Sequence, residues 1–353
     1  MYLEILFWIV IIIIAIVAIS LIFFYTIKQY ALFQATRDEK WYPDIEMCKD
    51  HEMSQDTHNS DNQKLSKNNS TSIKRTKYCK DYVDNFKSLY LIIGDKKCKS
   101  YTRKEITELS NSKVTNLSEL QYINIWKWEN FPGNRMVLYF HGNNDNISYR
   151  KYVIDITNRL KLNLMLVDYR GYGDSSGLPS SLALLEDAKT AYKYINQHYD
   201  YNEIIIWGES LGGIAAIWTA HKYKANCLVL LSTFADIRTI IDKLDINKSL
   251  KNLIKKFADG KLMNNGEWIK DVDIPTVIIH SPDDDLLPYV NAEINYNNVN
   301  VEKKKLINIS GPHAHPYFTD KELYQLLHFI EIKDPKVLDH KNIGEILDII
   351  NNI

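Results

Sequence analysis

The sequence predicts an α/β fold, in which helices cover both faces of a mostly parallel central sheet, preceded by one transmembrane helix. From about residue 117 onwards, short apolar runs alternate with stretches of helical length and spacing. Such alternation is typical of βαβ crossovers in a parallel sheet. Several of these runs are continuously apolar, as strands buried on both faces should be. Before this pattern, residues 5–27 are almost wholly apolar and uncharged, which is long enough for a membrane-spanning helix.

The N-terminal apolar segment is interpreted as an uncleaved membrane anchor of residues 1–28. A cleaved signal peptide usually has a basic start, a shorter apolar region and small residues at the cut site. Here Glu4 stands at the start, and no Ala-x-Ala pattern follows. Lys28, Arg37 and Lys40 follow the span, and the positive-inside rule therefore places the rest of the chain in the cytosol. We expect a single-pass membrane protein whose folded domain faces the cytosol.

Three further regions are predicted beyond the anchor. Residues 29–116 are expected to form a polar linker, and its part near 48–80 is rich in Asn, Ser, Lys and Asp. Because that part contains little to bury, we expect a disordered insertion there. Residues 117–335 are predicted to form the folded domain, and residues 336–353 a C-terminal tail.

The elements of the folded domain are expected in a regular order. The predicted strands are the apolar runs Tyr122–Trp126, Met136–Phe140, Leu164–Val167, Glu203–Trp207, Cys227–Leu231, Thr276–His280 and Lys305–Ile309. Helical length and spacing predict helices at Ser181–His198 and Leu211–Tyr223. The stretch from Ala235 to Asp271 lies between two strands and is long enough for a small lid of one or two helices, but not for a large cap domain.

Composition argues against several classes of function. Lys and Arg number 43 and Asp and Glu 44, for a net charge of −1, so no basic excess indicates a nucleic-acid partner. The four cysteines are scattered and form no CxxC pair, which argues against a zinc site and a dense disulfide framework. No HExxH-type spacing is present either. The sequence therefore predicts no metal and no cofactor.

The pentapeptide Gly208-Glu209-Ser210-Leu211-Gly212 directly follows a strand-like run. This pattern is typical of a nucleophile elbow, a sharp strand-to-helix turn that presents a reactive serine. Glycines two residues on either side are needed because side chains there would collide with the neighbouring strand and helix. The turn also aims backbone N–H groups at a developing oxyanion. We predict Ser210 as the nucleophile, and the alternative is a plain glycine-rich turn.

A serine hydroxyl needs a base and a group that orients this base. Three consecutive aspartates, Asp283–Asp285, follow the sixth predicted strand, and His313 and His315 follow the seventh. The carboxyl ends of parallel strands are where catalytic groups collect. His313 is preferred over His315 because it follows Gly311 closely, while the choice among the aspartates stays open. Taken singly, each group could instead belong to a solvated turn.

The segment Tyr139–Asn146 leaves the strand that should neighbour the elbow. A His-Gly turn at this place can present the backbone N–H of Asn143 beside that of Leu211. Two such donors form an oxyanion hole. His141 is expected to shape the turn rather than to act as the base. The alternative is a simple Asn-rich loop.

Residues from about Met136 to Ile330 resemble the α/β-hydrolase superfamily. They are most similar to its membrane-anchored, small-lid group, typified by bud-emergence-type proteins and α/β-hydrolase domain-containing protein 13. The resemblance is carried by three segments, Tyr139–Asn143, Val167–Ser180 (VDYRGYGDSSGLPS) and Trp207–Gly213 (WGESLGG). It implies that Asp168 and Arg170 are structural.

The resemblance also implies Ser210 as nucleophile, Asp284 as the acid and His313 as the base. Asp284 is implied by the family pattern His-Gly-x-x-Asp-x-x-Val-Pro, which lies over His280–Pro288. This chain departs from the pattern at two places, with Ser281 for the glycine and Leu287 for the valine.

These features predict a membrane-anchored serine hydrolase that cleaves acyl ester or thioester bonds through an acyl-enzyme intermediate. The expected substrate is an acyl lipid or an S-acylated protein. One alternative is a peptidase of the serine aminopeptidase type, and another is a non-catalytic α/β-hydrolase fold that serves as a membrane-bound binding module. A haloalkane or epoxide hydrolase would need Asp at the elbow, where this chain has Ser210.

Overall fold

The computed structural model describes residues 86–111, 120–243, 247–257 and 264–352. The predicted anchor at residues 1–28 and the predicted insertion near residues 48–80 lie outside these ranges. Across the described ranges, no helix combines the length and the apolar composition that crossing a bilayer requires.

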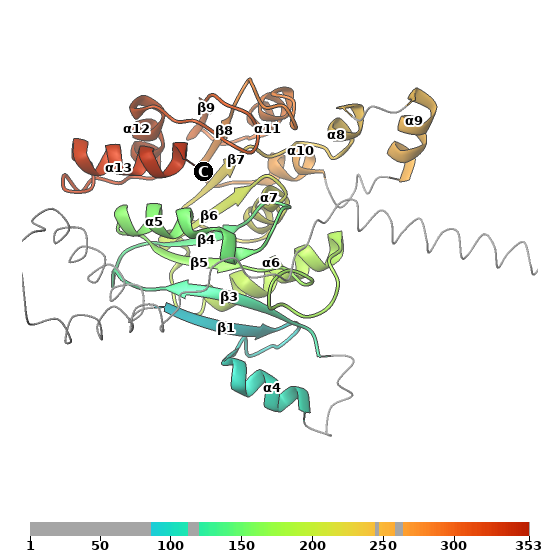
Figure 1. The fold of residues 1–353 in the computed structure, drawn as a ribbon, viewed down its shortest axis with the longest axis vertical. Helices are drawn as coiled ribbons and strands as arrows, with labels where there is room; N and C mark the ends of the chain where they lie inside the picture. Colours follow the sequence, from blue (N-terminus) through green and yellow to red (C-terminus); the bar gives the residue numbers. More distant parts are fainter. Residues whose placement is uncertain (1–85, 112–119, 244–246, 258–263, 353) are drawn as a thin grey trace, which may run out of the picture.

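A nine-stranded sheet runs through the centre of the structure (Figure 1), in the order β2-β1-β3-β5-β4-β6-β7-β8-β9. The strands are β1 (Phe86–Ile92), β2 (Ser100–Tyr101), β3 (Tyr122–Trp128), β4 (Met136–Phe140), β5 (Asn163–Val167), β6 (Ile204–Glu209), β7 (Cys227–Leu231), β8 (Thr276–His280) and β9 (Lys304–Asn308). The six strands from β5 to β9 along this order pair in parallel, whereas β1 pairs antiparallel with β2 and β3, and β3 with β5. The prediction of a mostly parallel sheet is confirmed.

The central strands are buried on both faces, as their apolar sequences predict. All five residues of β4 and all five of β5 are buried. Because successive side chains of a strand point to opposite faces, Leu138 and Phe140 belong to one hydrophobic core and Val137 and Tyr139 to the other.

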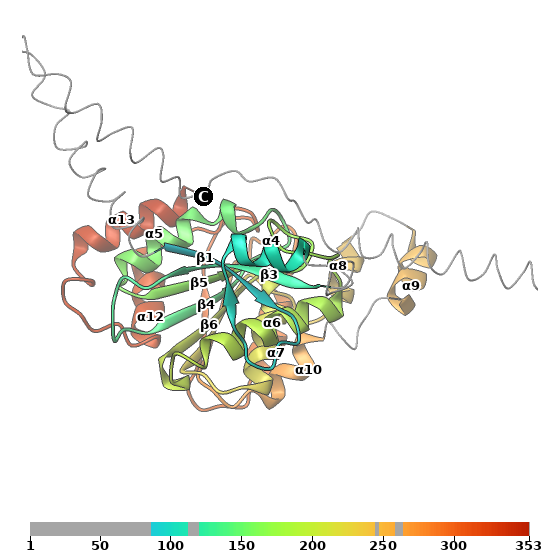
Figure 2. The same cartoon turned by 90° about the horizontal axis from the view of Figure 1, so that it is seen from below.

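Helices cover both faces of the sheet (Figures 1 and 2). One core contains apolar side chains of α6 (Ser181–Ile195), α7 (Gly212–Lys222) and α11 (Val290–Asn298). The other contains those of α5 (Lys151–Arg159), α12 (Asp320–Phe329) and α13 (His340–Asn351). The short helix α4 (Arg103–Asn111) lies beside β1 at the edge of the sheet.

Several helices begin at side chains that cap them. Ser180 accepts a hydrogen bond from the Ala183 N–H at the start of α6. Thr319 and Glu322 form a capping box at the start of α12. Asp339 accepts from the Asn342 N–H at the start of α13. These bonds satisfy N–H groups that have no acceptor within their own helix.

The folded domain begins before the predicted boundary at residue 117, and this part of the prediction is wrong. β1 pairs with the whole of β3, from Phe86 opposite Trp128 to Ile92 opposite Tyr122. Of its seven residues, Tyr90 and Leu91 are buried and the others lie in partly or fully exposed positions. A half-buried strand near the sheet edge has a weaker apolar pattern than a central strand. The sequence of β1 therefore resembles that of a linker.

The predicted C-terminal tail at residues 336–353 is also wrong, because most of it forms α13. Ile343, Ile346 and Ile350 are buried, at spacings of three and four residues that place them on one face of the helix. This face packs against the core that α5 and α12 also cover. Residues 340–351 therefore belong to the folded domain.

The predicted lid segment contains α8 (Arg238–Lys243), α9 (Lys248–Phe257) and α10 (Asn265–Trp268) within its described parts. α8 and α9 extend away from the sheet (Figures 1 and 2), while α10 lies beside α7 and α11. The action of this segment as a lid stays a prediction.

Candidate active site

Ser210 stands between the end of β6 and the start of α7, with a left-handed backbone φ of +50°. This conformation is uncommon for a residue other than glycine and costs on the order of 1–3 kcal/mol. Hydrogen bonds to the Ser210 backbone hold this conformation, and two of them come from the strand β7 and the segment after it. The Ser210 N–H donates to the Leu231 carbonyl over 2.9 Å, and the Thr233 hydroxyl donates to the Ser210 carbonyl over 2.7 Å. The turn thus projects the Ser210 side chain above the end of the sheet.

Close packing around the turn requires small residues at three positions. A Cβ on Gly212 would lie 2.0 Å from the Phe140 carbonyl oxygen. One on Gly208 would lie 2.6 Å from the Ala216 Cβ atom, and one on Gly213 would lie 1.9 Å from the Thr233 hydroxyl. A larger side chain therefore does not fit at the two predicted positions, Gly208 and Gly212. The same holds at Gly213.

The structure brings Ser210, His313 and Asp284 into one hydrogen-bonded chain. The Ser210 Oγ atom lies 3.0 Å from His313 Nε2, and His313 Nδ1 lies 2.8 Å from Asp284 Oδ2. Asp284 follows β8 and His313 follows β9, so both lie at the carboxyl end of the parallel strands. In this arrangement the carboxylate accepts the Nδ1 proton and leaves Nε2 free to accept the proton of the serine.

The side chain of Asp284 is 1% exposed, and its carboxylate accepts several hydrogen bonds. Its Oδ1 atom accepts from the backbone N–H groups of Leu286 and Leu287, over 3.0 and 2.6 Å. Burial alone would raise the pKa of Asp284, but the hydrogen bonds from His280, His313 and the Leu287 N–H outweigh it and hold this pKa well below its ordinary value. Asp284 is therefore ionised at neutral pH.

The alternative site residues Asp283, Asp285 and His315 do not contact the imidazole of His313 with their side chains. Asp283 and Asp285 are exposed, whereas Asp284 is buried. The Asp285 carboxylate accepts from the backbone N–H of His313 over 3.0 Å, not from its ring. His315 is exposed, and its N–H donates to the Pro312 carbonyl. Of the three aspartates, Asp284 is the one that contacts the imidazole of His313.

His280 was not recognised from the sequence as part of this site. It is fully buried at the end of β8, and its Nε2 atom lies 3.3 Å from Asp284 Oδ2 and 3.0 Å from the Leu287 carbonyl. The sequence signal was available, because His280 is the first residue of the His280–Pro288 pattern. That pattern pointed to Asp284 and gave the histidine no role.

Asn143 and Leu211 lie in the loops that meet at Ser210. A Cβ built on Gly142, the residue before Asn143, would lie 3.5 Å from the Ser210 Cβ atom, so this loop lies against the elbow. The Tyr172 hydroxyl donates to the Asn143 side-chain oxygen over 3.0 Å. Leu211 is the N-cap residue of α7, so its N–H is among those without an acceptor in the helix. Both residues line the same pocket as Ser210 and His313.

His141 is fully buried behind this loop and shapes it, as expected. Its Nδ1 atom donates to the Gly142 carbonyl over 2.7 Å. Its Nε2 atom lies 3.3 Å from Asp168 Oδ1, which also accepts from the Ile147 N–H over 2.9 Å. The ring stacks on Tyr169 with centroids 4.4 Å apart. His141 and Asp168 thus hold the start and the end of the loop together.

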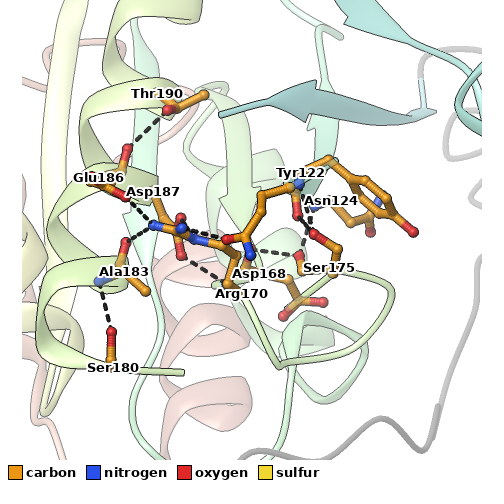
Figure 3. A network of polar contacts seen from close by, with 12 residues as sticks. Tyr122, Asn124, Asp168, Arg170, Ser175, Ser180, Ala183, Glu186, Asp187 and Thr190 are labelled. Atoms are coloured by element: carbon orange, nitrogen blue, oxygen red, sulfur yellow. Dashed lines mark hydrogen bonds and ion pairs between the residues drawn. The ribbon is translucent and has the colours of Figure 1, made fainter. Parts of the chain in front are cut away.

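Arg170 anchors the segment between β5 and α6 (Figure 3). Its Nε atom donates to Asp187 Oδ1 over 2.6 Å, and its Nη2 atom donates to Glu186 Oε2 over 2.7 Å and to the Ala183 carbonyl over 3.1 Å. The labelled Tyr122, Asn124, Asp168 and Ser175 lie on the side of Arg170 towards β3, where the Ser175 hydroxyl accepts from the Asn124 N–H. These contacts are structural, as the resemblance implied.

A half-buried carboxylate, that of Glu209, lies next to Ser210 and was also missed from the sequence. Glu209 Oε2 accepts from the hydroxyls of Tyr152, over 2.6 Å, and of Tyr139. Burial would raise the pKa of Glu209, but the Arg150 guanidinium and the two hydroxyls outweigh it and lower this pKa below its ordinary value. The motif pattern treats Glu209 as a variable position, so only its tertiary contacts reveal an ionised carboxylate beside the nucleophile.

A pocket of about 720 Å³ opens at Ser210 and His313. Its lining is mostly apolar, and Asn143, Leu211, Glu209 and Tyr152 belong to it. This combination of an apolar cavity and a few convergent polar groups is typical of a small-molecule site. No group of three or more His, Cys, Asp or Glu side chains that could hold a metal ion occurs in the part of the chain that the structure describes.

Comparisons with known proteins agree with this architecture. The family model described as "Serine aminopeptidase, S33" matches residues 132–269. Uncharacterized protein R595 of Acanthamoeba polyphaga mimivirus is 30% identical over 223 residues, which cover 56% of this chain and 73% of that protein. Protein bem46 of Schizosaccharomyces pombe is 29% identical over 157 residues, covering 43% of this chain and 52% of bem46. Alpha/beta hydrolase domain-containing protein WAV2 of Arabidopsis thaliana is 27% identical over 226 residues, which cover 57% of this chain and 71% of WAV2.

The sheet order, the strand-to-helix turn at Ser210 and these matches define the chain as a hydrolase of the α/β-hydrolase superfamily. Within this superfamily, it belongs to the bem46 type.

Proposed function

We propose that this chain is a membrane-anchored serine hydrolase that cleaves acyl ester or thioester bonds. The observation that carries the proposal is the hydrogen-bonded chain from Ser210 through His313 to Asp284, with distances of 3.0 and 2.8 Å, at the mouth of a mostly apolar pocket. A serine, a histidine and a buried carboxylate in this order supply a nucleophile, a base and a group that orients the base.

In the proposed reaction, His313 Nε2 takes the proton of Ser210 as the Oγ atom attacks the acyl carbon. The backbone N–H groups of Asn143 and Leu211 stabilise the resulting oxyanion. His313 then gives the proton to the leaving oxygen or sulfur, and an acyl-serine remains. A water molecule, deprotonated by His313, cleaves this intermediate and releases the acid. Asp284 stabilises the imidazolium that forms in each half of the cycle.

The substrate class follows from the pocket and from the predicted anchor. The pocket lining is largely aliphatic and aromatic, which favours a fatty acyl group over a charged or peptide group. An anchor at residues 1–28 would hold the domain close to the bilayer and raise the effective concentration of lipid-borne substrates. We therefore propose an acyl lipid or an S-acylated protein as the substrate, with the hydrolase domain on the cytosolic side.

Turnover of three substrate types by the full-length protein tests this proposal: acyl esters, acyl thioesters and aminoacyl anilides. We expect hydrolysis of esters or thioesters that disappears in Ser210→Ala. Cleavage of the anilides in preference to both would favour the peptidase alternative, which the description of the matching family model also suggests. No turnover of any substrate by the folded protein would favour the binding module.

A further inference from the structure

The carboxylate of Glu209 connects the nucleophile elbow to three neighbouring parts of the fold. Its Oε2 atom accepts from the hydroxyls of Tyr152, on α5, over 2.6 Å, and of Tyr139, on β4. Its Oε1 atom lies against the loop after β4, since a Cβ built on Gly142 would lie 3.4 Å from it. Because Glu209 directly precedes Ser210, these contacts tie the nucleophile to α5, to β4 and to this loop.

Arg150 is the N-cap residue of α5 and carries a buried positive charge. It is 8% exposed and lines the pocket together with Glu209. Its Nη2 atom donates to the Asn144 carbonyl over 2.8 Å, whereas its Nε atom has no hydrogen-bond partner among the described residues. A buried charge with so few hydrogen bonds needs an opposite charge nearby. Burial would lower the pKa of Arg150, but attraction to nearby negative charge, that of Glu209 most of all, raises it above its ordinary value.

Residues 142–145, which we call the oxyanion loop, carry the Asn143 N–H, one of the two donors of the proposed oxyanion hole. The loop turns sharply at Asp145, whose backbone φ of +63° lies in the left-handed region. A residue other than glycine persists in that conformation only where surrounding contacts hold it. The hydrogen bond from Arg150 to the carbonyl of Asn144 is such a contact, at the residue between Asn143 and Asp145.

The contacts of Glu209 and Arg150 do not lead to the groups that transfer protons. Among the described residues, the Ser210 hydroxyl and the His313 ring are hydrogen-bonded to each other, and the ring also to Asp284. Neither Glu209 nor Arg150 takes part in these bonds. The contacts that this pair of charges does make lead to the oxyanion loop.

We infer that Arg150 is a positioning residue for the oxyanion hole and that Glu209 holds it in place. The pair ties the oxyanion loop to the residue before the nucleophile, so that the Asn143 N–H keeps its distance from Ser210. The inference rests on the proposed function and deepens it, because it states how the chain holds one of the two oxyanion donors. A donor displaced by about 1 Å loses much of its effect on the transition state. The pair therefore acts on the chemical step.

Arg150→Met in the full-length protein tests the inference, with para-nitrophenyl butyrate as the substrate. Methionine fills part of the same space but has neither the charge nor the N–H donors. We expect kcat to fall by about tenfold or more while KM stays within about twofold of the wild-type value, because the oxyanion exists only in the transition state. The inhibition constant of an alkyl trifluoromethyl ketone, whose adduct with Ser210 carries an oxyanion, should rise by a similar factor.

Arg159→Met is the matched control. Arg159 lies at the other end of α5, forms an ion pair with Glu345 and does not line the pocket. Its replacement should leave kcat and the inhibition constant unchanged. Glu209→Gln removes the charge but keeps an acceptor for the two hydroxyls, and should lower kcat by severalfold at an unchanged KM. Added to Arg150→Met, it should cause little further loss, because both changes act through the same contact with the loop.

A folded Arg150→Met protein with the wild-type kcat overturns the inference. A higher KM at an unchanged kcat also overturns it, because Arg150 would then bind the substrate. Losses that multiply in the double variant overturn the link through Glu209. If Arg150→Met does not fold, Glu209→Gln should show the same fall in kcat at an unchanged KM, and a wild-type kcat in that variant overturns the inference. A folded wild-type protein that hydrolyses no acyl ester or thioester overturns the proposed function instead.

Discussion

His280 lies behind the carboxylate of Asp284, with its Nε2 atom 3.3 Å from the same Oδ2 atom that contacts His313. Nε2 also lies 3.0 Å from the Leu287 carbonyl. Since both neighbours are acceptors, Nε2 carries the proton and donates it. The His280 Nδ1 atom is buried and has no hydrogen-bond partner among the described residues. This pair extends the site by one residue beyond Ser210, His313 and Asp284.

His280→Phe is expected to slow acylation of Ser210. The change removes one charge-assisted hydrogen bond, so the pKa of Asp284 rises towards its ordinary value and the carboxylate holds His313 less firmly. We expect a loss of roughly tenfold in kcat. His280→Gln keeps an N–H donor and should retain most of the rate. Equal kcat values for the wild type and the Phe variant, or an equal loss in the Phe and Gln variants, would contradict this role.

The three consecutive aspartates provide a matched series. Asp284→Asn should lower kcat roughly a thousandfold, because an amide cannot stabilise the imidazolium and favours the wrong tautomer of His313. Asp283→Asn should leave kcat unchanged, since that side chain is exposed and does not contact His313. Asp285→Asn should lower kcat only slightly, because the Asp285 carboxylate contacts the backbone N–H of His313 and not its ring. A larger loss for Asp283 or Asp285 than for Asp284 would mean that the base is oriented differently.

Acidification should destabilise the fold through Asp284 and Glu209. In the unfolded chain their pKa values are about 3.9 and 4.3, and both are lower in the folded state. A carboxylate whose pKa is lower in the folded state stabilises the protein at pH values above its pKa in the unfolded chain. This stabilisation is lost as the pH falls through its pKa in the folded state.

The free energy of unfolding, measured by denaturant titration, should therefore fall as the pH drops below about 4. Asp284→Asn lacks one of the two groups and should show a shallower fall over the same range. Identical slopes for the wild type and this variant would show that Asp284 does not have a lowered pKa.

Gly212→Ala should destabilise the protein and abolish turnover. The new methyl group would lie 2.0 Å from the Phe140 carbonyl oxygen, so either the elbow or β4 must shift. We expect a loss of about 1–3 kcal/mol in unfolding free energy or more. Gly344→Ala is the control, because a Cβ there meets nothing within 4 Å and lies within α13. It should stabilise by about 0.5–1 kcal/mol, and a Gly212→Ala protein as active as the wild type would contradict the geometry of the turn.

The sequence predicts the central part of the fold well and its two margins poorly. β4, β7 and β8 occupy their predicted ranges, because a strand buried on both faces is apolar throughout. β1 was not predicted as a strand, because a half-buried strand does not form a continuous apolar run. α13 was not predicted because burial of Ile343, Ile346 and Ile350 depends on a core shared with α5 and α12, which are distant in the sequence.

The candidate site was predictable where a local backbone pattern encodes it. Ser210 could be located because its strained turn needs glycines at fixed distances in the sequence. Asp284 could not be separated from Asp283 and Asp285 by spacing, because the difference between them is burial. The roles of His280 and Glu209 depend on contacts with residues far along the chain. The membrane anchor and the substrate stay predictions.

A fluorophosphonate probe reacts with an activated serine, and its reaction with this protein tests whether Ser210 is such a nucleophile. The full-length protein and its Ser210→Ala variant would be treated in parallel, with labelling followed by fluorescence and the modified residue located by mass spectrometry. We expect rapid labelling at Ser210 that is absent in the variant. A demonstrably folded protein that is not labelled, or that is labelled equally in Ser210→Ala, would contradict it.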